Sequence, residues 1–175
     1  MRAAIPYYTI EDLEQFPEDG NRYELLDGVL LVTPSPSRAH QIVMVRLATA
    51  ITNALGDSAV VAASGVVLRD TNTQLEPDVL VDPPGMSLRA EWADVAEHWL
   101  AIEIFSPSSK IYDREFKRDA YLRLGVREVW LVDIDSEQIE VCTLFGSRVE
   151  KERVEWTAPH GTHRVVVELR DLLRD

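Results

Sequence analysis

The sequence predicts an α/β fold (an α+β mixed sheet with helices packed on it) that carries extra β structure at both ends. Residues 38–55 repeat apolar side chains with helical spacing, and residues 113–124 do so again just before a strand-like run at 128–133. Residues 99–105 are apolar on both faces of an extended strand, which is typical of a strand in the middle of a covered sheet. The predicted central order is therefore helix–strand–strand–strand–helix–strand.

The N-terminal region is predicted to form a short helix and then a hairpin. Thr9 is the expected N-cap, with Asp12 three residues later as its partner. Asp27-Gly28 suits the tight primed turn of a hairpin between strands at 23–26 and 29–32.

The long helix at 38–55 is expected to turn one side to the core and to end before Gly56. That side holds Ile42, Val45, Ala48 or Thr49, Thr52 and Leu55, and Val43, Leu47, Ala50 and Ala54 add apolar width. On the second helix the apolar side is expected to be Phe116, Ala120 and Leu124, with Gly125 after its end. The remaining predicted elements are strands at 60–63, 66–69, 75–81, 138–145, 148–156 and 163–168, a helical turn within 92–97 and an amphipathic tail at 169–174.

Length and composition favour a single domain spanning residues 1–175. The sequence contains no apolar run long enough to cross a bilayer and no apolar core of a signal peptide near Met1, so a cytoplasmic location is expected. A single cysteine, Cys142, excludes an intrachain disulfide and a thiolate zinc cluster, and its strand-like surroundings predict a buried apolar role.

The formal net charge of -12 argues against a protein that coats nucleic acid by bulk electrostatics. The charge does not exclude a nuclease, because bound divalent cations or a local basic patch can make the electrostatic potential positive at the site that binds nucleic acid. The segment 110–127 is slightly basic. It is either a face that meets a phosphate backbone or, as the safer interpretation, a salt-bridged helix.

Asp78 and Glu103 are the acidic residues that suggest a functional site, because both lie within apolar strand-like runs. A buried carboxylate is costly unless a metal, a hydrogen-bond donor or a cation accepts it. If the two strands are neighbours, the pair could hold a hard cation such as Mg²⁺ or Mn²⁺. Ordinary strand-end ion pairs are the alternative. For Asp78, an ion pair and a functional role are equally favoured. For Glu103, a functional role is favoured.

A phosphodiester site also needs a cation near the reacting group. The simplest arrangement puts a lysine two residues after Glu103, but that position is Phe105. Lys117 on the following helix is the best substitute, with Tyr121 one turn later. A solvated lysine paired with Asp113 is an equally weighted alternative.

Glu24 and His40 are weaker candidates. By periodicity Glu24 fits the polar face of an edge strand better than a site, although it could face the same pocket. His40, at the start of the long helix, could contact phosphate or move a proton, but a first-turn histidine is more often a polar neighbour of the cap. The other histidines, at 98, 160 and 163, lack ligand-like spacing.

Several motifs together resemble one known family. They are Tyr23-Glu24-Leu25-Leu26-Asp27-Gly28, Ser37-x-x-His40, Glu76-Pro77-Asp78-Val79, the run from Glu103 to Ser109, and Asp113-x-x-x-Lys117-x-x-x-Tyr121-x-x-x-Gly125 continuing to Asp133. The chain resembles the Uma2 family of restriction endonuclease-like proteins, in the PD-(D/E)XK nuclease superfamily, from about Thr9 to Phe145.

The resemblance implies a restriction endonuclease-like core of order α-β-β-β-α-β, with an N-terminal hairpin and extra C-terminal strands. It implies that Asp78 and Glu103 ligate a metal together with the Ile104 carbonyl, that Lys117 is a migrated catalytic lysine, and that Glu24 is a further acidic site residue. Phe105 departs from the basic superfamily motif.

Two functions are therefore carried forward. One is a Mg²⁺- or Mn²⁺-dependent endonuclease that hydrolyses DNA phosphodiester bonds. Such an enzyme is compatible with a homodimer, because cutting two strands needs two sites. In this hypothesis His40 and Tyr121 are available for phosphate contact. The other is a catalytically weak nucleic-acid-binding or assembly module that keeps the fold.

Overall fold

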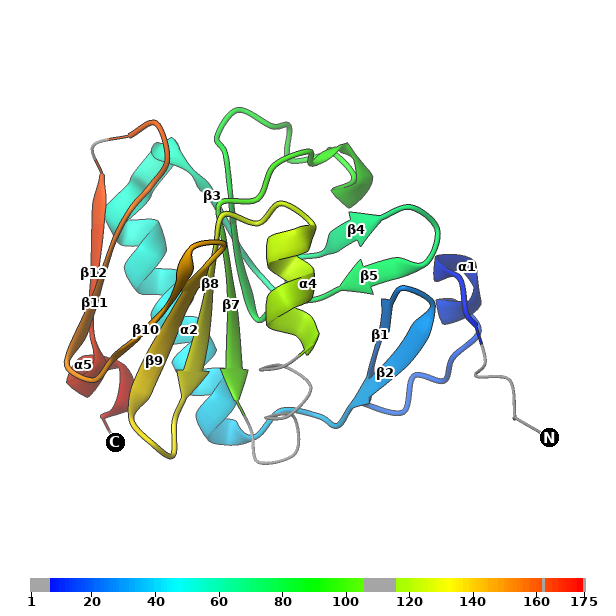
Figure 1. Cartoon of the computed structure of the whole chain (residues 1–175), viewed down its shortest axis with the longest axis horizontal. Coiled ribbons are helices and arrows are strands. Elements are labelled where there is room, and N and C mark those ends of the chain that lie inside the picture. The colour runs from blue at the N-terminus through cyan, green and yellow to red at the C-terminus, as the bar shows by residue number, and fades with distance from the viewer. Residues whose placement is uncertain (1–6, 106–115, 162, 175) are drawn as a thin grey trace.

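The structure is a computed structural model that describes residues 7–105, 116–161 and 163–174. Figure 1 shows a central sheet with α2 (Arg38–Leu55) behind it and α4 (Arg118–Arg123) in front. A smaller sheet lies to the right of α4, and a two-stranded ribbon lies to the left. The mixed α+β class predicted from the sequence is confirmed.

The central sheet places β7 in its interior, as the two-faced apolar pattern predicted. Its strands, in spatial order, are β10 (Gly146–Glu150), β9 (Gln138–Thr143), β8 (Glu128–Asp133), β7 (Leu100–Phe105), β6 (Val79–Asp82) and β3 (Val60–Ala63). All neighbouring pairs are antiparallel except β7 and β8, which are parallel. A parallel pair needs a crossover connection, and the segment containing α4 supplies it.

The smaller sheet has the order β2 (Val29–Thr33), β1 (Arg22–Leu26), β5 (Thr73–Leu75) and β4 (Val67–Arg69). The β1–β2 hairpin is as predicted, with φ of 49° at Asp27 and 79° at Gly28. Positive φ at both central residues defines a type I′ turn, whose twist matches that of the strands. Before it, α1 (Ile10–Leu13) has the predicted capping box, in which the Thr9 N–H donates to Asp12 Oδ2 over 2.7 Å.

The long helix α2 has the predicted bounds, but its buried side is centred on the residues expected only to add apolar width, together with Leu55 from the predicted side. The buried side is Val43, Leu47, Ile51 and Leu55, whereas Val45 is 57% exposed. The two stripes are both apolar in sequence, so periodicity could not choose between them. Packing against the sheet and the C-terminal ribbon decides which one is buried.

Only part of the second predicted helix falls within the described residues, and its start at 113 lies outside them. Its described part, α4, buries Ala120, Tyr121 and Leu122, and Gly125 follows it with φ 94°. Phe116, predicted to face the core, is 52% exposed, so the predicted stripe is one position out of phase there.

Two hydrophobic cores lie on opposite faces of the central sheet, because side chains alternate along each strand. On β7, Leu100, Ile102 and Ile104 join α2 and the C-terminal ribbon, whereas Ala101 and Phe105 join α4. Trp99 also lies in the first core, because it precedes the strand and does not follow its alternation.

The strand predicted at 75–81 is in fact two strands in different sheets. Thr73–Leu75 belongs to the smaller sheet, Val79–Asp82 belongs to the central sheet, and Glu76-Pro77-Asp78 connects them. Pro77 has no N–H to offer a ladder, which favours a break at this point.

The C-terminal prediction needs a similar correction. The segment 148–156 divides between β10, which pairs with β9, and β11 (Arg153–Thr157), which pairs with β12 (Arg164–Glu168). The amphipathic tail is α5 (Leu169–Leu173) and the predicted turn is η2 (Trp92–Asp94); a short η1 (Gly56–Ser58) follows α2.

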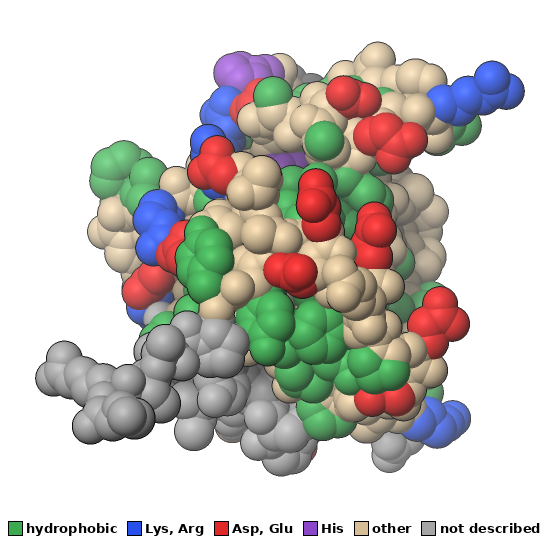
Figure 2. Space-filling model, turned by 90° about the vertical axis from the view of Figure 1, so that its right-hand side faces the viewer, with side chains coloured by type: hydrophobic (Ala, Val, Ile, Leu, Met, Phe, Trp, Pro, Cys, Tyr) green, Lys and Arg blue, Asp and Glu red, His purple; other side chains and the backbone are tan. Residues whose placement is uncertain are grey.

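Of the helices in the described residues, none combines the length and apolarity that crossing a bilayer takes. Figure 2 shows the side formed by the smaller sheet and its surroundings, where acidic and apolar side chains mix and Lys and Arg lie toward the margins. This face is not a broad basic surface.

Candidate functional site

The site forms where the two sheets meet. Glu103 lies in the middle of the central sheet and is 1% exposed. The pairing Val79↔Ile102, continued by one residue, places Asp78 opposite Glu103. The strands next to Asp78 and around Glu103 are therefore neighbours, which was the condition for the two acids to share a site.

Glu103 is held by two side chains from the α4 segment. Lys117 Nζ donates to Glu103 Oε1 over 2.7 Å, and the Tyr121 hydroxyl donates to the same oxygen over 2.6 Å. Burial, and next the charge of Glu103, raise the pKa of the Tyr121 hydroxyl well above its ordinary value. Tyr121 therefore stays protonated and acts as a fixed donor.

Lys117 is not the solvated lysine of the alternative interpretation. It is 1% exposed and also lies 2.9 Å from Glu24 Oε1. It immediately precedes α4, and the site residues Lys117 and Tyr121 are one helical turn apart, so both reach the same strand. The ammonium thus bridges carboxylates from both sheets.

Glu24 is not on an edge strand, contrary to the interpretation that periodicity favoured. β1 lies between β2 and β5, and Glu24 is fully buried. Besides Lys117, Glu24 Oε1 accepts the backbone N–H of Glu76 over 2.7 Å. Burial, and next the charge of Glu24, raise the pKa of the Glu76 carboxyl above its ordinary value.

Asp78 is surrounded by donors from three parts of the chain. Its Oδ2 accepts the Ile104 N–H over 2.7 Å, and its Oδ1 lies 3.0 Å from His40 Nε2 and 3.2 Å from Arg22 Nη1. Burial alone would raise the pKa of Asp78, but His40 and Arg22 together hold it below its ordinary value. The Asp78 side chain is therefore a carboxylate in the folded protein.

Arg22 is the site residue that sequence reasoning missed. Its Nη1 also donates to the Glu76 carbonyl over 3.0 Å, and its Nε lies 3.5 Å from Glu24 Oε2. Burial would lower the pKa of the guanidinium, but the charges of Glu103 and Glu24 raise it. A signal was present, since Arg22 and Glu24 are two residues apart and share a face of one strand.

A cavity of about 230 Å³ opens onto one side of this cluster. Arg22, His40, Asp78 and Ile104 line it, together with the loop 34–36 at the start of α2. Glu103, Lys117 and Glu24 are not among the residues that line it. The cavity therefore reaches the cluster through Asp78 and Arg22.

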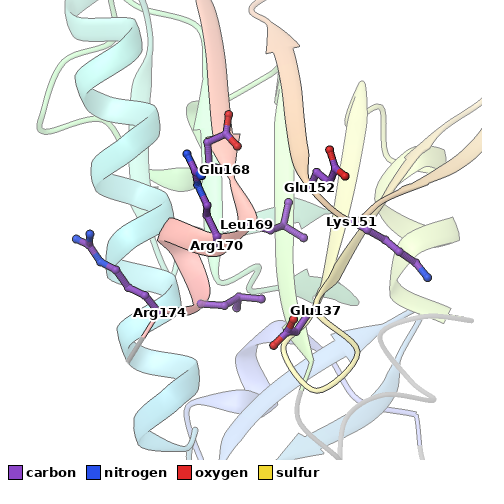
Figure 3. Close-up of a pocket in the computed structure, with 8 residues that line it drawn as sticks. Glu137, Lys151, Glu152, Glu168, Leu169, Arg170 and Arg174 are labelled. Atoms are coloured by element: carbon purple, nitrogen blue, oxygen red, sulfur yellow. The ribbon is translucent and has the colours of Figure 1, made fainter.

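A larger hollow of about 590 Å³ lies elsewhere, near α5 and the turns 137 and 151–152. Figure 3 shows that Lys151 and Arg174 extend away from its centre in opposite directions, beside Leu169. Its side chains carry both signs of charge, and none of the acids of the Asp78–Glu103 cluster lines it. The larger hollow is therefore not the candidate site, although its volume is greater.

The donor set of the cluster fits a small hard cation. Asp78 and Glu103 offer carboxylate oxygens, and Mg²⁺ is commonly held by one or two carboxylates while it keeps several waters. In residues 7–105, 116–161 and 163–174, no three His, Cys, Asp or Glu side chains group as a metal cage requires. Two carboxylates are fewer protein ligands than the four of a closed structural zinc site. The expected role of the Ile104 carbonyl stays a prediction; its N–H is what contacts Asp78.

The other candidate residues take structural roles. His98 Nδ1 lies 2.6 Å from Asp82 Oδ1, and Cys142 is buried, as predicted. In the described part of the basic segment, Arg118, Arg123 and Arg127 pair with Asp119, Asp27 and Glu97, which supports the salt-bridged interpretation there. Lys110 and Arg114 lie outside the described residues.

Comparison with known proteins places these observations in a family. The Uma2 family, described as "Putative restriction endonuclease", matches residues 10–169. Uncharacterized protein slr1290 of Synechocystis sp. is 28% identical over 145 residues, which cover 79% of this chain and 74% of that protein. The crystal structure of "a putative nuclease belonging to DUF820" from Anabaena variabilis matches with a TM-score of 0.73 and 19% identity, covering 95% of this chain and 97% of that one. The structural likeness shows a shared fold, and the family match over nearly the whole chain shows that this protein belongs to the Uma2 family.

Proposed function

We propose that this protein is a Mg²⁺- or Mn²⁺-dependent endonuclease that hydrolyses DNA phosphodiester bonds. The observation that supports it best is the buried pair of Asp78, directly before β6, and Glu103, on the neighbouring strand β7, with the Lys117 ammonium 2.7 Å from Glu103. Two acids and a cation in one cluster are the groups that phosphodiester hydrolysis requires. Membership of a family described as restriction endonucleases agrees with this.

In this proposal Asp78 and Glu103 hold the cation, with the Ile104 carbonyl as a further ligand. The cation supplies Lewis-acid polarisation of a phosphoryl oxygen and a more acidic water. Lys117 donates to Glu103 and positions the attacking water or offsets negative charge that develops on the phosphate. Glu24 acts through Lys117, since it fixes the ammonium from the opposite sheet.

The cavity supports a phosphate-sized contact. Its volume of about 230 Å³ is smaller than the roughly 300–1,000 Å³ of pockets that enclose a whole small-molecule ligand. It therefore suits a backbone phosphate and sugar presented from outside, with the bases left on the surface. His40, in the cavity wall at the start of α2, is the proposed polar contact; Tyr121, proposed with it from the sequence, instead supports Glu103 from within.

The test is cleavage of single-stranded, linear duplex and circular DNA by the purified protein with Mg²⁺, Mn²⁺ or EDTA. Cleavage should need the cation and should fall at least about 100-fold in Glu103→Gln and Asp78→Asn. Arg123→Gln, which removes an exposed ion pair with Asp27, is the purification control and should cleave like the wild type. Equal cleavage by wild type and Glu103→Gln would reveal a contaminant or another site.

A nucleic-acid-binding or assembly module without useful catalysis is the second candidate. It is favoured by the protein donors that already contact Asp78 and Glu103, because they stabilise both carboxylates without any metal. The net charge of -12 also fits it better than a freely acting nuclease. Absence of cleavage over all three DNA forms, with retained DNA binding, would select this function.

We also propose a homodimer in the cytoplasm, because duplex cutting needs two sites. β2 is an edge strand without a charged residue, and its Val29 and Val32 are 46% and 50% exposed. Edge strands usually carry charges that prevent pairing, so this edge is suited to a second copy. Val32→Lys should shift sedimentation equilibrium to monomer, and Val45→Lys, on exposed α2 surface, should not. A wild-type monomer at all concentrations would exclude the dimer.

A further inference from the structure

The cluster contains more acid than permanent cation within the described residues. The carboxyl groups are those of Glu24, Glu76, Asp78 and Glu103, and the permanent cations are Lys117 and Arg22. Buried charge is tolerated only when it is paired. Each cation therefore stabilises more than one acid, and its loss or movement changes the field at the others.

The two cations differ in how firmly they are held. The Lys117 side chain is 1% exposed and lies within 2.9 Å of carboxylate oxygens on both sheets. The Arg22 side chain is 23% exposed, its ion-pair distances are 3.2 and 3.5 Å, and it lines the cavity. Arg22 is thus the cation that can move without opening the core.

Asp78 shows where that movement would begin. The Ile104 N–H fixes Oδ2, and backbone atoms cannot leave a central strand. Oδ1 faces Arg22 and His40, and both line the cavity. A divalent cation that arrives at Asp78 from the cavity meets the Arg22 guanidinium, and like charges at this distance repel each other.

We propose that Arg22 is a positioning residue that exchanges partners: it neutralises Asp78 while no divalent cation is bound, and it holds a phosphate of the nucleic acid once the cation occupies Asp78. This inference rests on the proposed function. The contacts to Glu24 Oε2 and the Glu76 carbonyl would keep the guanidinium at the cavity wall. The planar fork of an arginine suits two phosphate oxygens, which a lysine cannot match.

The first experiment measures metal binding without DNA, by calorimetric titration with Mn²⁺. Removal of the competing charge in Arg22→Gln should tighten Mn²⁺ binding by about tenfold, since a neighbouring charge shifts such equilibria by roughly one to three powers of ten. Arg22→Lys keeps the charge and should bind Mn²⁺ like the wild type, as should Arg123→Gln. Circular dichroism confirms that each variant is folded. If Arg22→Gln does not fold, the DNA-binding measurement on Arg22→Lys described next carries the test.

The second experiment measures binding of a labelled duplex in Ca²⁺ by fluorescence anisotropy. Arg22→Gln and Arg22→Lys should both weaken DNA binding by about tenfold, because neither offers the bidentate fork. Unchanged Mn²⁺ affinity in Arg22→Gln, or unchanged DNA affinity in both variants, overturns the exchange of partners. If the wild type binds no Mn²⁺ at all, or binds it equally well as Asp78→Asn, the proposed metal site itself fails.

Discussion

Lys117 Nζ lies 2.7 Å from Glu103 Oε1, and both side chains are 1% exposed. The pair joins the residue before α4 to the centre of β7, and Glu24 adds a second carboxylate from the smaller sheet. An exposed ion pair contributes little to stability, whereas breaking a buried one leaves an uncompensated charge. The Lys117–Glu103 pair is therefore expected to stabilise the folded protein as well as to form part of the site.

Lys117→Met should destabilise the protein by about 3–5 kcal/mol, because Glu24 and Glu103 would stay buried without their common cation. Urea denaturation followed by circular dichroism measures the free energy of unfolding. Arg123→Met, which breaks the exposed pair with Asp27, is the matched control and should cost no more than about 1 kcal/mol. Equal stability of the two variants would mean that Lys117 is not a structural counter-ion.

Tyr121→Phe should lower stability by about 1.5–3 kcal/mol, the usual range for a hydrogen bond to a charged group. The ring is completely buried and its hydroxyl donates to Glu103 over 2.6 Å, so only that donor is lost. Tyr23→Phe removes a hydroxyl bond of 2.8 Å to Asp19 at the surface and serves as the control. A loss in Tyr121→Phe no greater than in Tyr23→Phe would contradict the assignment of Tyr121 as a required donor.

Glu128→Gln should stabilise the protein at neutral pH and leave it unchanged in acid. Burial raises the pKa of Glu128 above its ordinary 4.5, although Trp130 Nε1 donates to it over 2.7 Å. An acid whose pKa is raised on folding favours the folded state below that ordinary value, and its benefit is lost as pH rises through the folded pKa. Glutamine keeps the acceptor for Trp130 without the charge.

Thermal unfolding of Glu128→Gln from pH 3 to pH 8 measures this effect. The gain over wild type should grow as the pH rises above about 4.5 and then level off. Glu18→Gln, at an exposed position, provides the comparison. A constant difference between Glu128→Gln and wild type at every pH would assign the effect to packing instead.

Leu47→Ala should cost about 2–5 kcal/mol, because Leu47 is completely buried on the core side of α2. Val45→Ala, two positions earlier in the same helix and 57% exposed, should change stability by no more than about 0.5 kcal/mol. Denaturant midpoints of the two variants test the helix orientation directly. The reverse order of effects would restore the face expected from periodicity.

The acids of the site could be predicted from the sequence because they stand out in apolar surroundings. Glu103 interrupts a two-faced strand, and Lys117 could be found only by asking what replaces Phe105. Arg22 does not stand out in this way, since an arginine beside Tyr23 in a hairpin looks like ordinary polar surface; only its shared strand face with Glu24 links it to the site. Its position depends on how one sheet packs on the other.

The order of the main elements was also predictable, but strand boundaries around 76–78 and 151–152 were not. Leu75, Pro77 and Val79 keep the alternation across the first point, and the charged run 150–153 at the second also fits the exposed part of one long strand, so local pattern does not show that the chain changes sheets there. The choice between the Val43 and Val45 sides of α2 fails for the same reason. In each case long-range packing decides between structures that the local pattern allows equally.

The connection Glu76-Pro77-Asp78 carries the chain from the smaller sheet to the central sheet, and the site forms only when residues from both sheets have come together. Arg22 and Glu24 are made early in synthesis, and Glu103 and Lys117 come much later in the chain. Contacts between such distant segments form only after the loop between them has been closed, which favours local hairpins and helices first. The charged cluster should therefore close late in folding, as the two sheets dock, and the nascent chain should expose its acids to solvent until that moment.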